Sequence, residues 1–171
     1  MSTSEKKSAQ IIAIDAHKVR AVDGGSELHK PTRYGYCMAG YGFLVGERAL
    51  SEVIIDPTVF PMPKAPEWLL GLTNLRGNIV PVFDLWKFIR TQKPVRLTPT
   101  VLVLDLGDAP VGLVIDNLPK PVPLDSQPVH TLPPAPALQP FLKRGIHALG
   151  CEWWEFDYQQ FLAHLASVDS R

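Results

Sequence analysis

The segment 63–85 constrains the fold more than any other part of the chain. Proline and glutamate near its start suit the first turn of a helix, so residues 66–70 predict one short helical turn. Arg76 and Gly77 then suit a tight reversal between two runs of strand-forming residues. The segment is therefore expected to form a helical turn followed by a β-hairpin with a charged tip.

Most of the remaining chain consists of short stretches rich in aromatic and β-branched residues, separated by turn residues. Two such stretches flank residues 107–110 and two more flank residues 150–151, so each pair predicts a hairpin. Helical patterns are confined to residues 66–70, a stretch near 84–90 and the extreme N- and C-terminal regions. The fold is therefore expected to be mainly β, with more strand than helix.

Residues 1–32 differ from the rest and form an N-terminal extension. Its apolar residues fall close to helical spacing between Gln10 and Val22, which favours a short amphipathic helix packed on the domain or on a partner. The alternative is a partly disordered leader. The pattern alone leaves both open.

Composition excludes several classes of protein. A length of 171 residues suits one domain or two small subdomains with a shared core. Seventeen basic residues balance 17 acidic ones, whereas a nucleic-acid-binding surface needs an excess of basic residues. The N-terminus has no pattern of a secretory signal, and no apolar run is long enough to span a membrane, so the chain is expected in the cytoplasm without direct membrane insertion.

Residues that could carry chemistry are scattered. The five histidines show no metal-binding or triad spacing, and Cys37 and Cys151 lack zinc-type pairing. We therefore expect no catalytic residue, no metal site and no cofactor. Trp153 and Trp154 project to opposite faces of one strand, so at most one should face the core and the other becomes a candidate contact.

The central segment resembles the CheW family of chemosensory coupling proteins, in which a short helical turn precedes an Asn-x-Arg-Gly hairpin and an Asp-Leu pair. The positions that match at fixed spacing are Pro66, Gly71, Asn74, Arg76, Gly77, Pro81, Asp84 and Leu85. Gly112 and Asp116 match a later Val-Gly-x-x-Val-Asp element of the family, and the likeness extends from about residue 33 to about 166. The resemblance implies a domain over residues 33–168, built as two intertwined, small, SH3-like, five-stranded β-barrels with short helices and no catalytic site.

The resemblance also implies a binding site and its partners. In the family, the arginine that matches Arg76 pairs with a glutamate at the position of Glu52. The expected partner-binding residues are Leu50, Glu52, Gly71, Arg76 and Ile79. Their implied partners are the cytoplasmic tip of a methyl-accepting chemoreceptor, docked in the groove between the barrels, and the regulatory domain of a CheA-type histidine kinase.

Four departures from common CheW proteins resemble the type IV pilus, or twitching-motility, branch of the family: a long leader, Asn78 after the Arg-Gly turn, Trp86 after the Asp-Leu pair, and an unusually aromatic stretch at residues 152–156. The sequence therefore predicts a non-enzymatic adaptor at membrane-associated receptor arrays. The alternatives are a small nucleic-acid-binding barrel, which would need aromatic residues within a basic stripe, and an enzyme of uncharacterised type.

Overall fold

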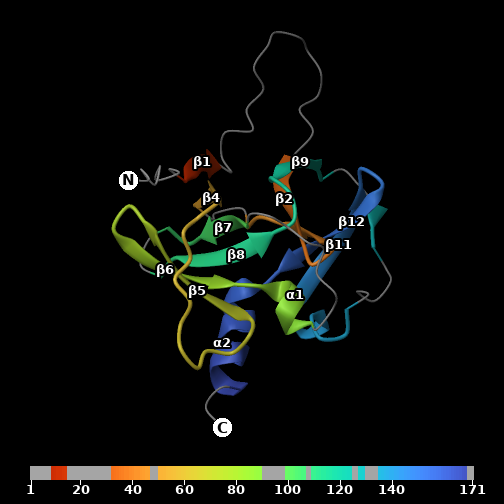
Figure 1. Ribbon diagram of the computed structural model, residues 1–171. Coiled ribbons are helices and arrows are strands. Elements are labelled where there is room, and N and C mark those ends of the chain that lie inside the picture. The colour runs from red at the N-terminus through yellow and green to blue at the C-terminus, as the bar shows by residue number, and fades with distance from the viewer. Residues whose placement is uncertain are drawn as a thin grey trace.

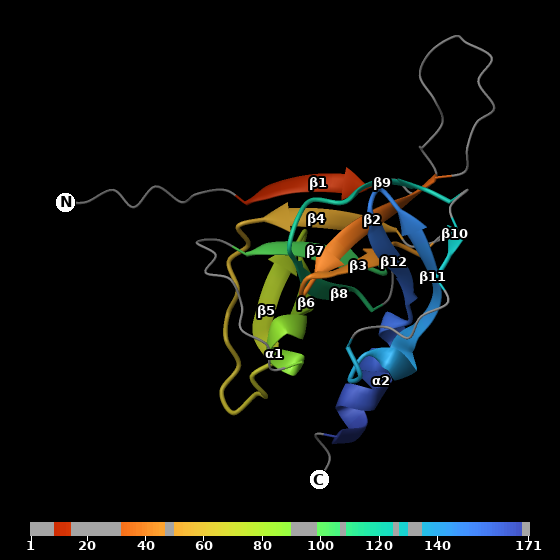
Figure 2. The same ribbon diagram turned by 90° about the vertical axis from the view of Figure 1, so that its right-hand side faces the viewer.

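The computed structural model describes residues 9–14, 32–46, 50–89, 99–106, 109–124, 127–129 and 135–168. Within these residues, two curled sheets of six strands each pack against one another, and two helices lie along one side of the pair (Figures 1 and 2). The prediction that strand exceeds helix is confirmed.

The first sheet has the strand order β1-β4-β7-β8-β6-β5. Its strands are β1 (Gln10–Ile14), β4 (Ser51–Ile55), β5 (Leu69–Leu75), β6 (Asn78–Phe83), β7 (Thr100–Leu104) and β8 (Val111–Ile115). Phe60 curls over β5 and exchanges two backbone hydrogen bonds with Leu72, of 2.7 and 2.9 Å. The interior of this sheet is filled almost entirely by branched aliphatic side chains, among them Ile54, Val80 and Val103.

The second sheet has the order β10-β11-β12-β3-β2-β9. Its strands are β2 (Thr32–Met38), β3 (Tyr41–Leu44), β9 (Lys120–Pro123), β10 (Gln127–Pro128), β11 (Leu142–Ala148) and β12 (Cys151–Phe156). After β3 the chain crosses to the first sheet for β4 to β8 and then returns for β9 to β12. This exchange produces the expected intertwined pair of sheets, but each described sheet has six strands where five were expected.

The main core lies between the two sheets. Leu102 and Leu113 of the first sheet share a cluster there with Phe43 and Trp154 of the second sheet, and with Phe161 of helix α2 (Tyr158–Val168). The helix predicted near residues 84–90 is α1 (Leu85–Phe88), and a 3-10 helix spans Gln139–Phe141. The predicted C-terminal helix and both predicted hairpins are also confirmed.

Both α-helices begin after an aspartate. Asp84 accepts a hydrogen bond of 3.1 Å from the backbone N–H of Trp86. Asp157 accepts one of 3.0 Å from the N–H of Gln160 and also pairs with Lys143. The Lys143 ammonium, followed by the Gln160 N–H, lowers the pKa of the Asp157 carboxyl. Each carboxylate thereby satisfies an N–H group that the first helical turn leaves open.

The prediction of a helix from Gln10 to Val22 is wrong for its first part, because residues 10–14 form strand β1. Ile12 and Ile14 alternate toward the core, which is the period of a strand, and all five residues pair with β4. The rest of the predicted helix, residues 15–22, lies outside the described residues.

Two further predictions are corrected. Residues 66–70 form a turn closed by a 2.9 Å bond from the Leu69 N–H to the Pro66 carbonyl, and β5 already begins at Leu69, where it pairs with Phe83. Trp153 and Trp154 are both buried. Trp153 fills the interior of the second sheet while Trp154 enters the main core, because β12 has protein on both faces.

Candidate partner-binding site

Glu52 is the second residue of β4 and lies between Ala13 of β1 and Val103 of β7. It shares a face of β4 with Ile54, whose side chain fills the interior of the first sheet. The Glu52 side chain is only 7% exposed. A carboxylate so placed loses most of its hydration and needs a partner inside the protein.

Arg76 provides that partner from the turn between β5 and β6. The turn places Arg76 at a φ of +52°, and the Asn74 side-chain oxygen accepts a 3.0 Å bond from the Gly77 N–H within it. Arg76 Nη1 donates a hydrogen bond to Glu52 Oε1, while 62% of the arginine side chain stays exposed. The ion pair implied by the family resemblance is therefore present, with one buried and one exposed member.

The second carboxylate oxygen of Glu52 is buried and has no hydrogen-bond partner among the described residues. Buried polar atoms in native proteins are rarely unpaired, because each costs roughly 1–3 kcal/mol. Among the described residues, only the Arg76 guanidinium donates a hydrogen bond to the Glu52 carboxylate. Any event that moves Arg76 therefore changes the environment of this charge.

The other three predicted site residues lie in different surroundings. Leu50 precedes β4 and is 62% exposed, and Ile79 on β6 is 67% exposed. Gly71 is buried in β5 at a φ of +143°, and a Cβ added there would lie 2.2 Å from the Phe60 carbonyl oxygen. Gly71 thus permits a close backbone approach, whereas Leu50 and Ile79 offer apolar surface.

Ile79 lines an apolar groove of about 540 Å³ between the β5–β6 hairpin and α2. The hairpin side of the groove is formed by Trp68, Leu69, Ile79, Pro81 and Phe83, and the α2 side by Leu162, Leu165 and Ala166. Residues 109–111 also line the groove. Such a groove suits the apolar face of a helix.

Trp68 supports one wall of this groove. Its ring stacks on Phe83, with centroids 5.9 Å apart and planes 16° from parallel, and it packs against the main core while half-buried. We expect Trp68→Ala to lower the free energy of unfolding by about 2–3 kcal/mol, less than for a fully buried tryptophan. Denaturant unfolding measures this loss; an unchanged midpoint would show that the stacking contributes nothing.

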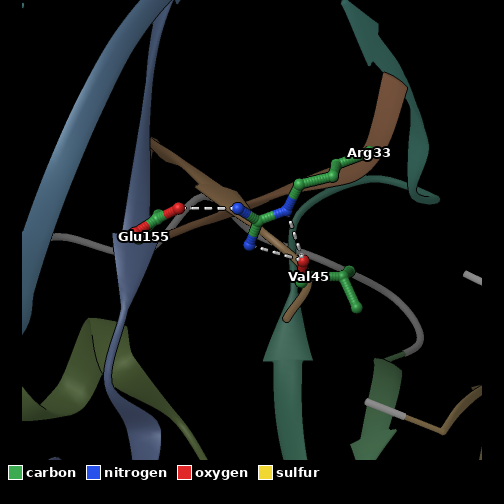
Figure 3. Close-up of polar contacts among 3 residues, drawn as sticks. All are labelled: Arg33, Val45 and Glu155. Carbon is green, nitrogen blue, oxygen red and sulfur yellow. Dashed lines mark hydrogen bonds and ion pairs between the residues drawn. The ribbon is translucent and has the colours of Figure 1, made fainter. Parts of the chain in front are cut away.

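A second ion pair was not predicted from the sequence. Arg33 on β2 donates from Nε and Nη2 to the Val45 carbonyl, at 3.0 and 2.8 Å, and from Nη1 to Glu155 on β12 at 2.6 Å (Figure 3). Its side chain is 13% exposed. The pair joins β2 and β12, which lie on either side of β3. Because Arg33 and Glu155 are 122 positions apart, no local sequence pattern indicates that they meet.

Asp116 and Asn117, which follow β8, connect the two sheets. The Asp116 carboxylate accepts bonds from the Gly40 N–H at 2.8 Å and from the Trp86 indole N–H at 2.9 Å. The Asn117 side chain accepts from the Cys37 N–H at 2.9 Å. Burial raises the pKa of the Cys37 thiol, which keeps it protonated near neutral pH. These bonds fix the β2–β3 turn against the end of β8.

Fold and site together define a two-barrel β scaffold with an apolar groove and a half-buried ion pair. The CheW-like domain family matches residues 38–150, which is well over half of the chain. The chain therefore belongs to the CheW-like domain family. Like that family, it is a chemotaxis-type signal-transduction adaptor.

Several known proteins are similar to this chain. Protein PilI of Pseudomonas aeruginosa is 29% identical over 138 residues, covering 79% of this chain and 77% of that protein. Chemotaxis protein CheW of Klebsiella aerogenes is 34% identical over 87 residues, covering 50% and 52%. The crystal structure of scaffolding protein TtCheW from Thermoanaerobacter tengcongensis covers 80% of this chain and 90% of its own, with a TM-score of 0.61 and 20% identity, and supports the fold.

Proposed function

We propose that residues 33–168 hold a chemoreceptor and a CheA-type kinase in a fixed mutual geometry, and that residues 1–32 extend this unit. The family couples receptors to CheA kinases in general. The observation that carries the proposal is the half-buried Glu52–Arg76 pair at the turn that also leads into the apolar groove. The mechanism is a coupling of two binding equilibria through shared contacts, without catalysis.

We assign the groove beside Ile79 to the helical tip of the receptor. Its lining is apolar, which suits the apolar face of an amphipathic helix, and Ile79 lies only three residues from Arg76 in the sequence. Leu50, Glu52 and Arg76 form the neighbouring surface, which we assign to the kinase regulatory domain or to the flank of the receptor. Gly71 supports both by shaping β5.

The similarity to PilI over most of the chain supports a role in type IV pilus motility. We propose that the protein works in the cytoplasm, at receptor arrays next to the membrane. Within the described residues, none of the helices is long and apolar enough to cross a bilayer. The same residues contain no group of three or more His, Cys, Asp or Glu side chains that could hold a metal ion.

Charge reversal at Arg76 tests the proposed binding site. Arg76→Glu places a second carboxylate beside Glu52 and reverses the charge that a partner meets at the exposed tip. We expect affinity for the receptor tip or the kinase regulatory domain to fall at least about tenfold, or roughly 1.4 kcal/mol, in titration calorimetry.

The matched control is Lys87→Glu, the same charge change at an exposed residue of α1. It should leave both affinities within about twofold. Equal losses for the two variants would indicate a general charge effect, and unchanged binding of every chemosensory partner by Arg76→Glu would remove Arg76 from the site.

A further inference from the structure

The outer edge of β1 differs from the other sheet edges. Strand β1 is the terminal strand of the first sheet and lies at the rim of the molecule in both views, next to β4 (Figures 1 and 2). Among the described residues it pairs with β4 alone. Its second edge therefore presents backbone N–H and C=O groups to its surroundings.

The other three terminal strands carry the usual protection against edge pairing. Strand β9 has the sequence Lys-Pro-Val-Pro, and β10 is two residues long and ends in a proline. Strand β5 is covered by the backbone of Phe60, which bonds to Leu72. Lysine, proline, shortness and coverage are the devices by which proteins block edges.

Strand β1 has none of these devices within the part of the chain that the structure describes. Its sequence, Gln-Ile-Ile-Ala-Ile, contains no charge, no proline and no glycine. Ile11 is 40% exposed, and Gln10 and Ala13 are exposed as well. An uncharged, β-prone edge is a template for another strand.

We propose that β1 pairs with β1 of a second copy of this chain, antiparallel and about a twofold axis at Ile12. In this register Ile12 faces Ile12 of the other copy, and Ile11 faces Ala13. Ile12 is half-buried against the main core, so its counterpart extends an apolar cluster that already exists. The strand carries no charge and the chain has a net charge of zero, so two copies do not repel one another.

The size of the contact sets its strength. Five residues on each side bury far less than the roughly 1,200–2,000 Å² of a stable interface, so the dimer is expected to be weak, with a Kd between about 10 µM and about 1 mM. Such a dimer joins two first sheets edge to edge and makes the adaptor bivalent. In a crowded array, two linked adaptors bind neighbouring receptor or kinase molecules more strongly than the affinity of one adaptor indicates.

Charged variants of Ile11 test this register. In the proposed pair the two Ile11 side chains are diagonal neighbours on one face, within reach of long side chains. Sedimentation of the full chain, from about 5 µM to about 500 µM, should show a monomer–dimer equilibrium. Ile11→Lys and Ile11→Glu should each weaken it at least about tenfold, whereas an equimolar mixture of the two should recover the dimer.

Leu118→Lys is the control, because it places the same charge on an exposed leucine outside β1. It should leave the equilibrium unchanged, and all variants should keep the wild-type melting temperature. A chain that stays monomeric over the whole range overturns the proposal and leaves the edge to an extended segment of another protein. A dimer that Ile11→Lys leaves intact also overturns it. So does a mixture of Ile11→Lys and Ile11→Glu that dimerises no more strongly than either variant alone.

Discussion

Gly71→Ala should destabilise the fold by at least about 3 kcal/mol, because two effects act at the same position. The φ of +143° lies where L side chains are rarely found, and the added Cβ would meet the Phe60 carbonyl oxygen at 2.2 Å and its carbon at 2.7 Å. The Phe60 backbone cannot retreat without breaking its two bonds to Leu72, which cover the edge of β5. Denaturant unfolding of the variant measures the loss.

Gly77→Ala is the matched control for this prediction. Gly77 also has a positive φ, of +92°, but nothing lies within 4 Å of the Cβ that the substitution would add. It should therefore cost only about 1–2 kcal/mol, from backbone strain alone. Equal losses for the two variants would show that the contact with Phe60 is unimportant and that the first sheet tolerates a shift of that segment.

The sequence was sufficient to predict the class of fold because hairpins are local. Six residues join β7 to β8 and two join β11 to β12, so a short window of sequence contains both strands of each pair and the turn between them. The exchange of strands between the two sheets has no local signal. It was expected only from the resemblance to CheW proteins.

The errors share a physical cause. Residues 10–14 were assigned to a helix because their apolar spacing fits both periods in so short a segment, and the pairing with β4 decides between them. Trp154 was expected to be exposed if Trp153 was buried, because alternation describes a sheet with one solvated face. Strand β12 instead has the second sheet's interior on one side and the main core on the other.

For the site, the sequence motif located the residues but not their burial. The resemblance paired Glu52 with Arg76, and the structure adds that the glutamate is buried while the arginine is exposed. The ion pair of Arg33 with Glu155 and the bonds of Asp116 to Gly40 and Trp86 join distant segments. Such contacts follow from the packing of the sheets and leave no spacing to recognise.

Because Glu52 is buried and Arg76 is exposed, substitutions of the two residues should have very different effects on the free energy of unfolding. Arg76→Ala leaves the Glu52 carboxylate, only 7% exposed, without its partner, and its Oε2 already has none among the described residues. We expect the free energy of unfolding to fall by about 2–3 kcal/mol, less than for a fully buried pair because Arg76 is largely exposed. Glu52→Gln keeps the shape and removes the charge, and the freed arginine remains hydrated. It should cost less than about 1 kcal/mol.

A double-mutant cycle separates the pair from its surroundings. If the loss in Arg76→Ala comes from the unpaired charge of Glu52, then adding Glu52→Gln to that variant should restore about 1–2 kcal/mol, so that the double variant is more stable than Arg76→Ala alone. The cycle needs the free energies of unfolding of four proteins under one set of conditions. Strictly additive losses would mean that water reaches Glu52 as soon as Arg76 is removed, and the ion pair would then contribute to partner binding without contributing to the stability of the fold.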